Sequence, residues 1–120
     1  PTREQLTADS QGGDKYAAAR AKLLLARLER DGSLAPNYPY PVQAWRLGGQ
    51  LDWVFLGGEV VVDYALRLKS ELGPARTWVA GYANDVMAYI PSRRVLVEGG
   101  YEGGGAMVYY GQPTRWANRA

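Results

Sequence analysis

Residues 51–82 read LDWVFLGGEVVVDYALRLKSELGPARTWVAGY, and this stretch decides the fold. Its beginning, 51–56, and its end, 77–82, are short runs rich in apolar and aromatic residues, which is typical of strands. Between these runs, apolar residues recur at helical spacing: Val61, Ala65, Leu68 and Leu72. Gly57-Gly58 ends the first run, and Gly73-Pro74 stops the helix. We therefore predict a strand, a helix that opens at Glu59, and a second strand, which together form a parallel, right-handed βαβ unit.

The segments upstream of this unit predict a hairpin and a packing helix. Residues 42–47 are a second apolar and aromatic run, separated from 51–56 by Gly48-Gly49-Gln50, which is a hairpin signal. Further upstream, residues 14–31 carry a helical apolar face: Ala17, Ala21, Leu24 and Leu28. Asp14 is the expected N-cap and Asp31-Gly32 the expected stop. The polar, turn-rich residues 1–13 are interpreted as a lead-in or connecting segment.

Downstream of the unit, the chain is predicted to become a long, glycine-rich and mostly irregular segment. A short helix is expected over 92–97, followed by Gly99-Gly100 and Gly103-Gly104-Gly105. The predicted fold class is therefore α/β: a hairpin plus a βαβ unit, with a packing N-terminal helix and a Gly-rich C-terminal segment. At 120 residues, the chain has the length of one domain.

The composition excludes several functions for this sequence acting alone. The net charge is +2 and no stretch concentrates lysine and arginine, which disfavours nucleic-acid binding. No apolar run approaches the roughly 18 residues that a membrane span requires. Cysteine is absent, so no disulfide or thiolate metal site can form. Histidine is absent as well, so these residues alone supply neither a histidine base nor a histidine-ligated zinc ion.

Glu59 is the first candidate for a functional role. It directly follows two glycines, at the expected junction of a strand and a helix. A carboxylate at a helix N-terminus is stabilised by the helix dipole by about 0.3–1 kcal/mol, so Glu59 has a structural interpretation as well as a functional one. Gly58 is expected to let the backbone present this carboxylate at the rim of the sheet.

The other candidates lie after the second strand of the unit. Asn84 follows the strand directly, and its amide is expected to fix a loop. Asp85 is open to two interpretations, a ligand or a turn residue. Tyr89 precedes Ile90-Pro91, and Tyr101 stands within the glycine cluster. Each tyrosine is either a packed aromatic or part of a pocket.

Taken together and in order, several short motifs resemble the C-terminal part of the catalytic domain of the neutral/alkaline, non-lysosomal ceramidases. The motifs are Gly57-Gly58-Glu59, Gly81-x-x-Asn84, Tyr89-Ile90-Pro91, Tyr101-Glu102 and Tyr110-Gly111. The likeness covers about residues 40–116, and residues 17–34 are similar to the helix that precedes this part of the family. The chain would then be one portion, residues 14–120, of a larger mixed-sheet catalytic domain.

The resemblance implies zinc-dependent amide hydrolysis, in which ceramide or another N-acyl amide lipid is cleaved. In the family, two histidines from earlier in the domain hold the zinc together with a glutamate and a tyrosine, which match Glu59 and Tyr89. A second tyrosine, close to the scissile amide, matches Tyr101. The resemblance further implies an upstream part of the same domain that supplies the two histidines and a catalytic serine, a secreted or periplasmic location, and peripheral contact with a membrane.

The chain departs from the family at Gly57, where the best-known ceramidases have proline, and at Val86, where they have tyrosine. The zinc ligands therefore match better than the substrate pocket does. Two alternatives stay open. With four tryptophans and nine tyrosines, the chain could be an aromatic-rich module that binds sugars or lipid head groups without a metal. It could also be a degenerate relative that serves as an interaction surface.

Overall fold

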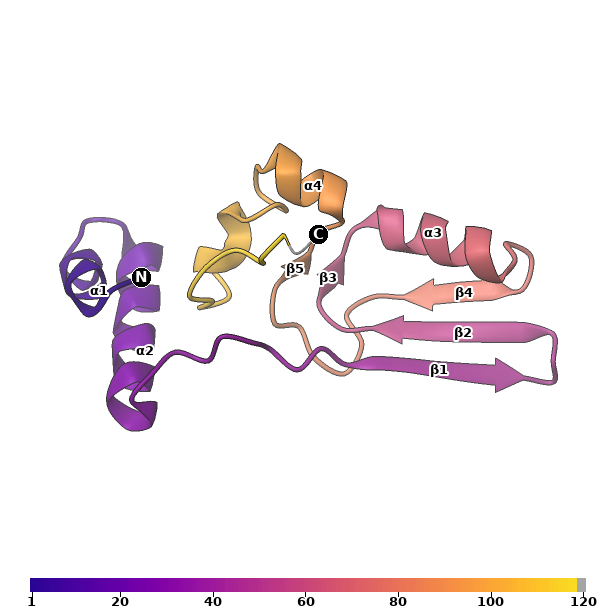
Figure 1. The fold of residues 1–120 in the computed structure, drawn as a ribbon, viewed down its shortest axis with the longest axis horizontal. Helices are drawn as coiled ribbons and strands as arrows, with labels where there is room; N and C mark the ends of the chain where they lie inside the picture. Colours follow the sequence, from indigo (N-terminus) through magenta and orange to yellow (C-terminus); the bar gives the residue numbers. More distant parts are fainter. Residues whose placement is uncertain (119–120) are drawn as a thin grey trace.

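The computed structural model describes residues 1–118, which form an elongated α/β molecule measuring 54 × 30 × 27 Å. The radius of gyration is 17.3 Å, larger than the value of about 14 Å expected for a compact domain of this length. Helices α1 (Arg3–Ser10) and α2 (Lys15–Asp31) lie at one end and a three-stranded sheet at the other, with a smaller two-stranded sheet between them (Figure 1). Within the described chain, no helix has the length and hydrophobicity of a membrane span.

Helix α1 corrects the interpretation of residues 1–13 as a lead-in segment. Thr2 and Gln5 form a capping box: the Gln5 backbone N–H donates to the Thr2 hydroxyl, and the Thr2 N–H donates to the Gln5 side chain. Leu6 is fully buried against Ala21 and Leu24 of α2. The prediction was wrong because α1 has only one large apolar residue, Leu6, and so shows no helical period, although Thr2-x-x-Gln5 is a start signal.

Helix α2 forms as predicted. The Asp14 carboxylate accepts hydrogen bonds from the backbone N–H groups of Tyr16 (2.8 Å) and Ala17 (3.0 Å), which satisfies two of the free donors at the helix start. The helix ends at Gly32, whose φ of 74° is the left-handed conformation typical of a glycine stop.

The three-stranded sheet confirms the hairpin and the parallel strands of the βαβ unit. Strands β1 (Val42–Leu47) and β2 (Leu51–Leu56) are antiparallel, and β2 pairs in parallel with β4 (Thr77–Ala80), giving the order β1-β2-β4. One face carries an aromatic row, because Trp53 stands in register with Trp45 and Trp78. Trp45 and Trp78 are 50% and 57% exposed, so this face is open in the described chain.

Helix α3 (Val62–Leu72) lies between β2 and β4 in sequence and contacts β4. It begins three residues later than predicted, because Glu59 and Val60 form strand β3 and Val61 is the N-cap. Glu59 is therefore not at a helix N-terminus, and the dipole argument for its charge is wrong. The expected buried face is the more sheltered side of α3, since Ala65 and Leu68 are half-buried whereas Leu66 is 62% exposed. Within the described chain, however, no residue of α3 is fully buried, and Leu72 of the expected face is 42% exposed.

Asp52 of β2 bonds to β1 and to the residue that precedes β4. Its carboxylate accepts hydrogen bonds from Arg46 at 2.6 Å and from Arg76 at 2.6 and 3.0 Å, and Asp52 is buried. The hydrogen bonds with Arg46 and Arg76 hold the pKa of Asp52 below its ordinary value of 3.8. A depressed pKa in the folded state stabilises the fold above the unfolded-state pKa, and this contribution is lost as the pH falls through the folded-state pKa.

We therefore expect Asp52→Asn to lower the free energy of unfolding near neutral pH. The difference from the parent chain should shrink as the pH falls below 3.8 and vanish below the folded-state pKa, because both chains then carry an uncharged group at this position. Urea unfolding of both chains at about pH 7 and about pH 2 measures this difference. Asp9→Asn, at an exposed position of α1, is the control and should have no such pH-dependent effect. A difference for Asp52→Asn that is equal at both pH values would contradict the role of its charge.

The middle of the molecule is built from β3 (Glu59–Val60), β5 (Tyr89–Ile90), α4 (Arg93–Glu98) and the 3-10 helix η1 (Gly105–Val108). The short helix expected over 92–97 is confirmed, with Ser92 as its N-cap. Met87, Ala88 and Met107 form the buried core of this region. Helix α2 docks here as well, since Arg20 donates to the backbone oxygens of Gln112 and Pro113.

Candidate functional site: a glutamate among tyrosines

The site is positioned by the parallel pairing of β3 with β5. Each strand has two residues, and Glu59 stands directly opposite Tyr89 in the register. Because neighbouring residues in register project to the same side of a sheet, the two side chains lie on one face. Glu59 and Tyr89, which are 30 positions apart in the sequence (89 − 59), are thus brought together.

Gly58 makes this pairing possible. Its φ is +71°, and a Cβ atom added here would lie 2.7 Å from the Ala88 carbonyl oxygen and 2.8 Å from the Ile90 side chain. The Gly58 N–H donates to the Asp85 oxygen at 2.7 Å, and the Glu59 N–H donates to the Ala88 oxygen at 2.9 Å. A residue without a side chain lets the two backbones approach this closely, which is the physical basis of the supporting role expected for Gly58.

Two tyrosine hydroxyls hold the Glu59 carboxylate. The Tyr110 hydroxyl donates to Oε1, and the Tyr82 hydroxyl donates to Oε2 at 2.9 Å. Each carboxylate oxygen therefore has its own phenol donor, and the orientation of the group is fixed from both sides. Neither tyrosine was predicted as a site residue. Tyr82 lies just after β4, near the end of the sheet, and Tyr110 belongs to the Tyr110-Gly111 motif, but neither signal assigned the tyrosine a role at Glu59.

The hydrogen bonds also set the charges in the cluster. The bonds from Tyr110 and Tyr82, together with the neighbouring Tyr89 hydroxyl, lower the pKa of Glu59, so its carboxylate is ionised at neutral pH. The same carboxylate raises the pKa of Tyr89 to about 12, and it also raises the pKa values of Tyr110 and Tyr82. At neutral pH the site is therefore one negative carboxylate surrounded by uncharged phenols.

Tyr101 lies beside Tyr89, as part of a wider group of rings. The Tyr89 and Tyr101 ring centroids are 5.5 Å apart with the planes at 70°, an edge-to-face contact. Tyr101 is 52% exposed, and its hydroxyl makes no hydrogen bond among residues 1–118. Tyr101 is thus held in place by ring packing against Tyr89, and its exposed phenol is available to a bound molecule.

Asn84 does not join the cluster. It is exposed, its φ is +67°, and its side chain makes no hydrogen bond within the described chain. Its position is in the turn after β4, where the Tyr82 N–H donates to the Gly58 oxygen at 2.9 Å. This turn places Tyr82 where its hydroxyl can donate to Glu59. Asp85 lies in the same turn, where its N–H donates to the Ala83 oxygen at 2.8 Å, and its carboxylate accepts a hydrogen bond from the Tyr38 hydroxyl at 2.5 Å.

Glu59 and Tyr89 carry oxygen atoms of the kind that hard metal ions bind. A carboxylate and a deprotonated phenol would together be two of the four ligands that a four-coordinate zinc ion needs. Within residues 1–118, no group of three or more histidine, cysteine, aspartate and glutamate side chains lies close together. Any complete zinc centre would therefore need ligands in addition to those described.

We compared the chain with protein-family models, with curated proteins and with solved structures, and no comparison gave a match. The resemblance to the ceramidases therefore stays a prediction. Function is inferred from the residues around Glu59.

Proposed function

We propose that this chain supplies part of the active site of a zinc-dependent amide hydrolase that resembles the neutral ceramidases. Glu59 and Tyr89 are its zinc ligands, and Tyr101 is its substrate contact. The observation that carries this proposal is the register pairing of Glu59 with Tyr89, with the Tyr101 ring packed against Tyr89. The three residues to which the resemblance assigns roles in zinc-dependent amide hydrolysis thus lie together, although they come from separate segments of the chain.

The state of the ligands supports the proposal. Glu59 is an ionised carboxylate held by Tyr82 and Tyr110, as ligating carboxylates commonly are by outer partners. Tyr89, with a pKa of about 12, has to lose its proton to become a ligand, and a nearby metal charge lowers the pKa of such a group. Two histidine ligands and a serine would come from a part of the same protein outside this sequence, as the resemblance implies.

Each side chain has a defined role in this proposal. When bound, zinc would polarise the amide carbonyl and lower the pKa of a water or serine hydroxyl. Tyr82 and Tyr110 keep Glu59 oriented toward Tyr89. The exposed Tyr101 hydroxyl donates to the amide oxygen as negative charge develops on it. The substrate class is N-acyl amide lipids, with ceramide as the first candidate.

Replacing Tyr101 with phenylalanine tests its role. We expect kcat for N-acyl amide hydrolysis to fall by about a hundredfold, the usual effect of removing one oxyanion donor. The zinc content should not change, because Tyr101 is not a ligand in this proposal. Tyr109→Phe removes an exposed phenol from the same ring group and is the control. Loss of zinc in Tyr101→Phe, or unchanged kcat, would contradict the assignment.

The function itself is tested with the whole gene product that contains this sequence. It should hydrolyse a fluorescent N-acylsphingosine, lose that activity on treatment with a chelator, and regain it when zinc is restored. Activity that survives complete removal of metal, or the absence of activity toward any N-acyl amide lipid in the metal-loaded protein, would reject the proposal.

The aromatic face of the three-stranded sheet favours a second candidate function, the binding of sugar rings or lipid head groups. Trp53 and Trp78 pack edge to face with centroids 5.8 Å apart, and Trp45 packs against Phe55 at 5.4 Å. Binding on this face would be lost in Trp45→Ala and would be insensitive to chelators. A glycan and lipid array distinguishes the two candidates, because the hydrolase proposal requires no binding at Trp45.

A further inference from the structure

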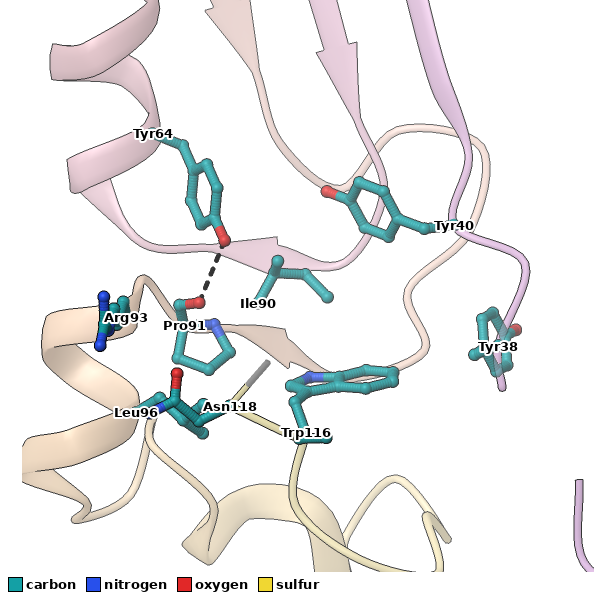
Figure 2. Close-up of a pocket in the computed structure, with 10 residues that line it drawn as sticks. Tyr38, Tyr40, Tyr64, Ile90, Pro91, Arg93, Leu96, Trp116 and Asn118 are labelled. Atoms are coloured by element: carbon teal, nitrogen blue, oxygen red, sulfur yellow. Dashed lines mark hydrogen bonds between the residues drawn. The ribbon is translucent and has the colours of Figure 1, made fainter. Parts of the chain in front are cut away.

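A cavity lies on the opposite side of strand β5 from the Glu59 cluster. Successive residues of a strand project to opposite faces, so Tyr89 belongs to the glutamate cluster while Ile90 lines this cavity. The cavity has a volume of about 380 Å³, within the range of about 300–1,000 Å³ that small-molecule sites occupy. Figure 2 shows Ile90 at its centre, with Tyr64 and Tyr40 on one side and Trp116 on the other.

The polar atoms of the aromatic residues around this cavity are already occupied. The Tyr40 hydroxyl donates to the Gly57 oxygen at 2.8 Å, the Tyr64 hydroxyl to the Pro91 oxygen at 3.1 Å, and the Trp116 indole to the Tyr89 oxygen at 2.8 Å. The rings therefore offer their apolar surfaces to the cavity. Burial raises the pKa of Tyr40 to about 12 and raises that of Tyr64, so both are uncharged at neutral pH. The part of a ligand that fills this space is therefore apolar.

Among residues 1–118, the cation that lines the cavity is Arg93. Arg93 is exposed and makes no ion pair or side-chain hydrogen bond among residues 1–118, whereas its neighbour Arg94 is paired with Asp63 and Glu98. In Figure 2, Arg93 lies at the side of Pro91 and Leu96, at the opposite end of the view from Tyr38. Tyr38 bonds to the Asp85 carboxylate. The Arg93 guanidinium therefore lies at one end of the cavity, and the Asp85 carboxylate is held by Tyr38 near the other.

We propose that this cavity binds a small monocarboxylate with an apolar body. The carboxylate pairs with the Arg93 guanidinium, which makes no side-chain hydrogen bond within residues 1–118 and presents its donors in the planar arrangement that a carboxylate fits. The apolar body lies over Ile90 and Leu96, against the ring of Trp116. The carboxyl group points away from Asp85, because the two negative charges repel each other. This site is separate from the glutamate cluster and does not depend on the zinc proposal.

Octanoate and octanol are the matched probes, since they share the chain and differ in the head group. Each is titrated into the isotope-labelled protein, and amide and indole shifts are followed by NMR. We expect octanoate to shift Ile90, Leu96 and the Trp116 indole and to bind more tightly than octanol. Arg93→Gln should weaken octanoate binding about tenfold, the effect of one charge-assisted hydrogen bond, and leave octanol binding unchanged.

Arg94→Gln is the control, because it removes the same charge from the adjacent position, outside the cavity. It should bind octanoate as the parent chain does. Equal affinities for octanoate and octanol would mark the cavity as an unselective apolar groove and overturn the proposal. Equal weakening by Arg93→Gln and Arg94→Gln would overturn it as well, since net charge would then explain the binding. Shifts confined to the aromatic sheet face around Trp45, where a lipid or a partner protein would bind, would also count against it.

Discussion

Replacing Glu59 with glutamine is expected to abolish zinc binding and to lower amide hydrolysis by more than about a hundredfold, since even outer-shell changes at metal sites cost about 10–100-fold. The amide has almost the same size but carries no charge, so it neither attracts a divalent cation nor stabilises it. Metal analysis of the purified gene product, together with its rate of N-acyl amide hydrolysis, measures both effects.

Glu102→Gln is the matched control for this substitution. Glu102 is the other glutamate close to the proposed substrate contact, directly after Tyr101, and it is exposed without a side-chain hydrogen bond in the described chain. Both substitutions remove one negative charge, so a general electrostatic effect would appear in both. A Glu59→Gln protein that retains its zinc, or a Glu102→Gln protein that loses it, would contradict the ligand assignment.

The largest effect on stability is expected from Gly58→Ala. The backbone at Gly58 is left-handed, with a φ of +71°, which costs about 1–2 kcal/mol for a residue with a side chain. The new methyl group would also press against the Ala88 oxygen at 2.7 Å, and such overpacking costs about 1–3 kcal/mol more. We expect the free energy of unfolding to fall by about 2–5 kcal/mol, measured by urea denaturation.

Gly48→Ala separates the two contributions. Gly48 also has a positive φ, +58°, but a Cβ atom there would have nothing within 4 Å. In this variant, the free energy of unfolding should fall only by the cost of the left-handed backbone, about 1–2 kcal/mol. If Gly58→Ala were no more destabilising than Gly48→Ala, the close approach of β3 to the loop before β5 would not be needed for folding.

Local patterns in the sequence were enough to predict much of the fold. Strands β1, β2 and β4 have apolar runs bounded by glycine and proline, and α2 has both a helical period and a cap at Asp14, so each was placed nearly correctly. The two-residue strands β3 and β5 are too short to show any period. Their pairing depends on Gly58 and the turn after β4, which is a tertiary property. Glu59 was therefore assigned to a helix when it belongs to a strand.

The candidate site was predictable only in part for the same reason. Glu59, Tyr89 and Tyr101 were selected from motif order, but their proximity comes from the β3–β5 register and from ring packing. The hydrogen bonds from Tyr82 and Tyr110 to Glu59 were not predicted, although Tyr110 stands in one of the motifs, because a tyrosine in a loop has no pattern that reveals its partner. Asn84 matched a motif, yet its side chain lies outside the cluster.

The most direct test of the account is whether Glu59 and Tyr89 ligate the same metal ion. Copper(II) substituted into the gene product would give a visible charge-transfer band if a phenolate is a ligand. We predict a band that disappears in Tyr89→Phe and in Glu59→Gln, and that persists in Tyr82→Phe, which removes a supporting phenol only. A band that is unchanged in Tyr89→Phe would show that Tyr89 is not a ligand and would contradict the proposed site.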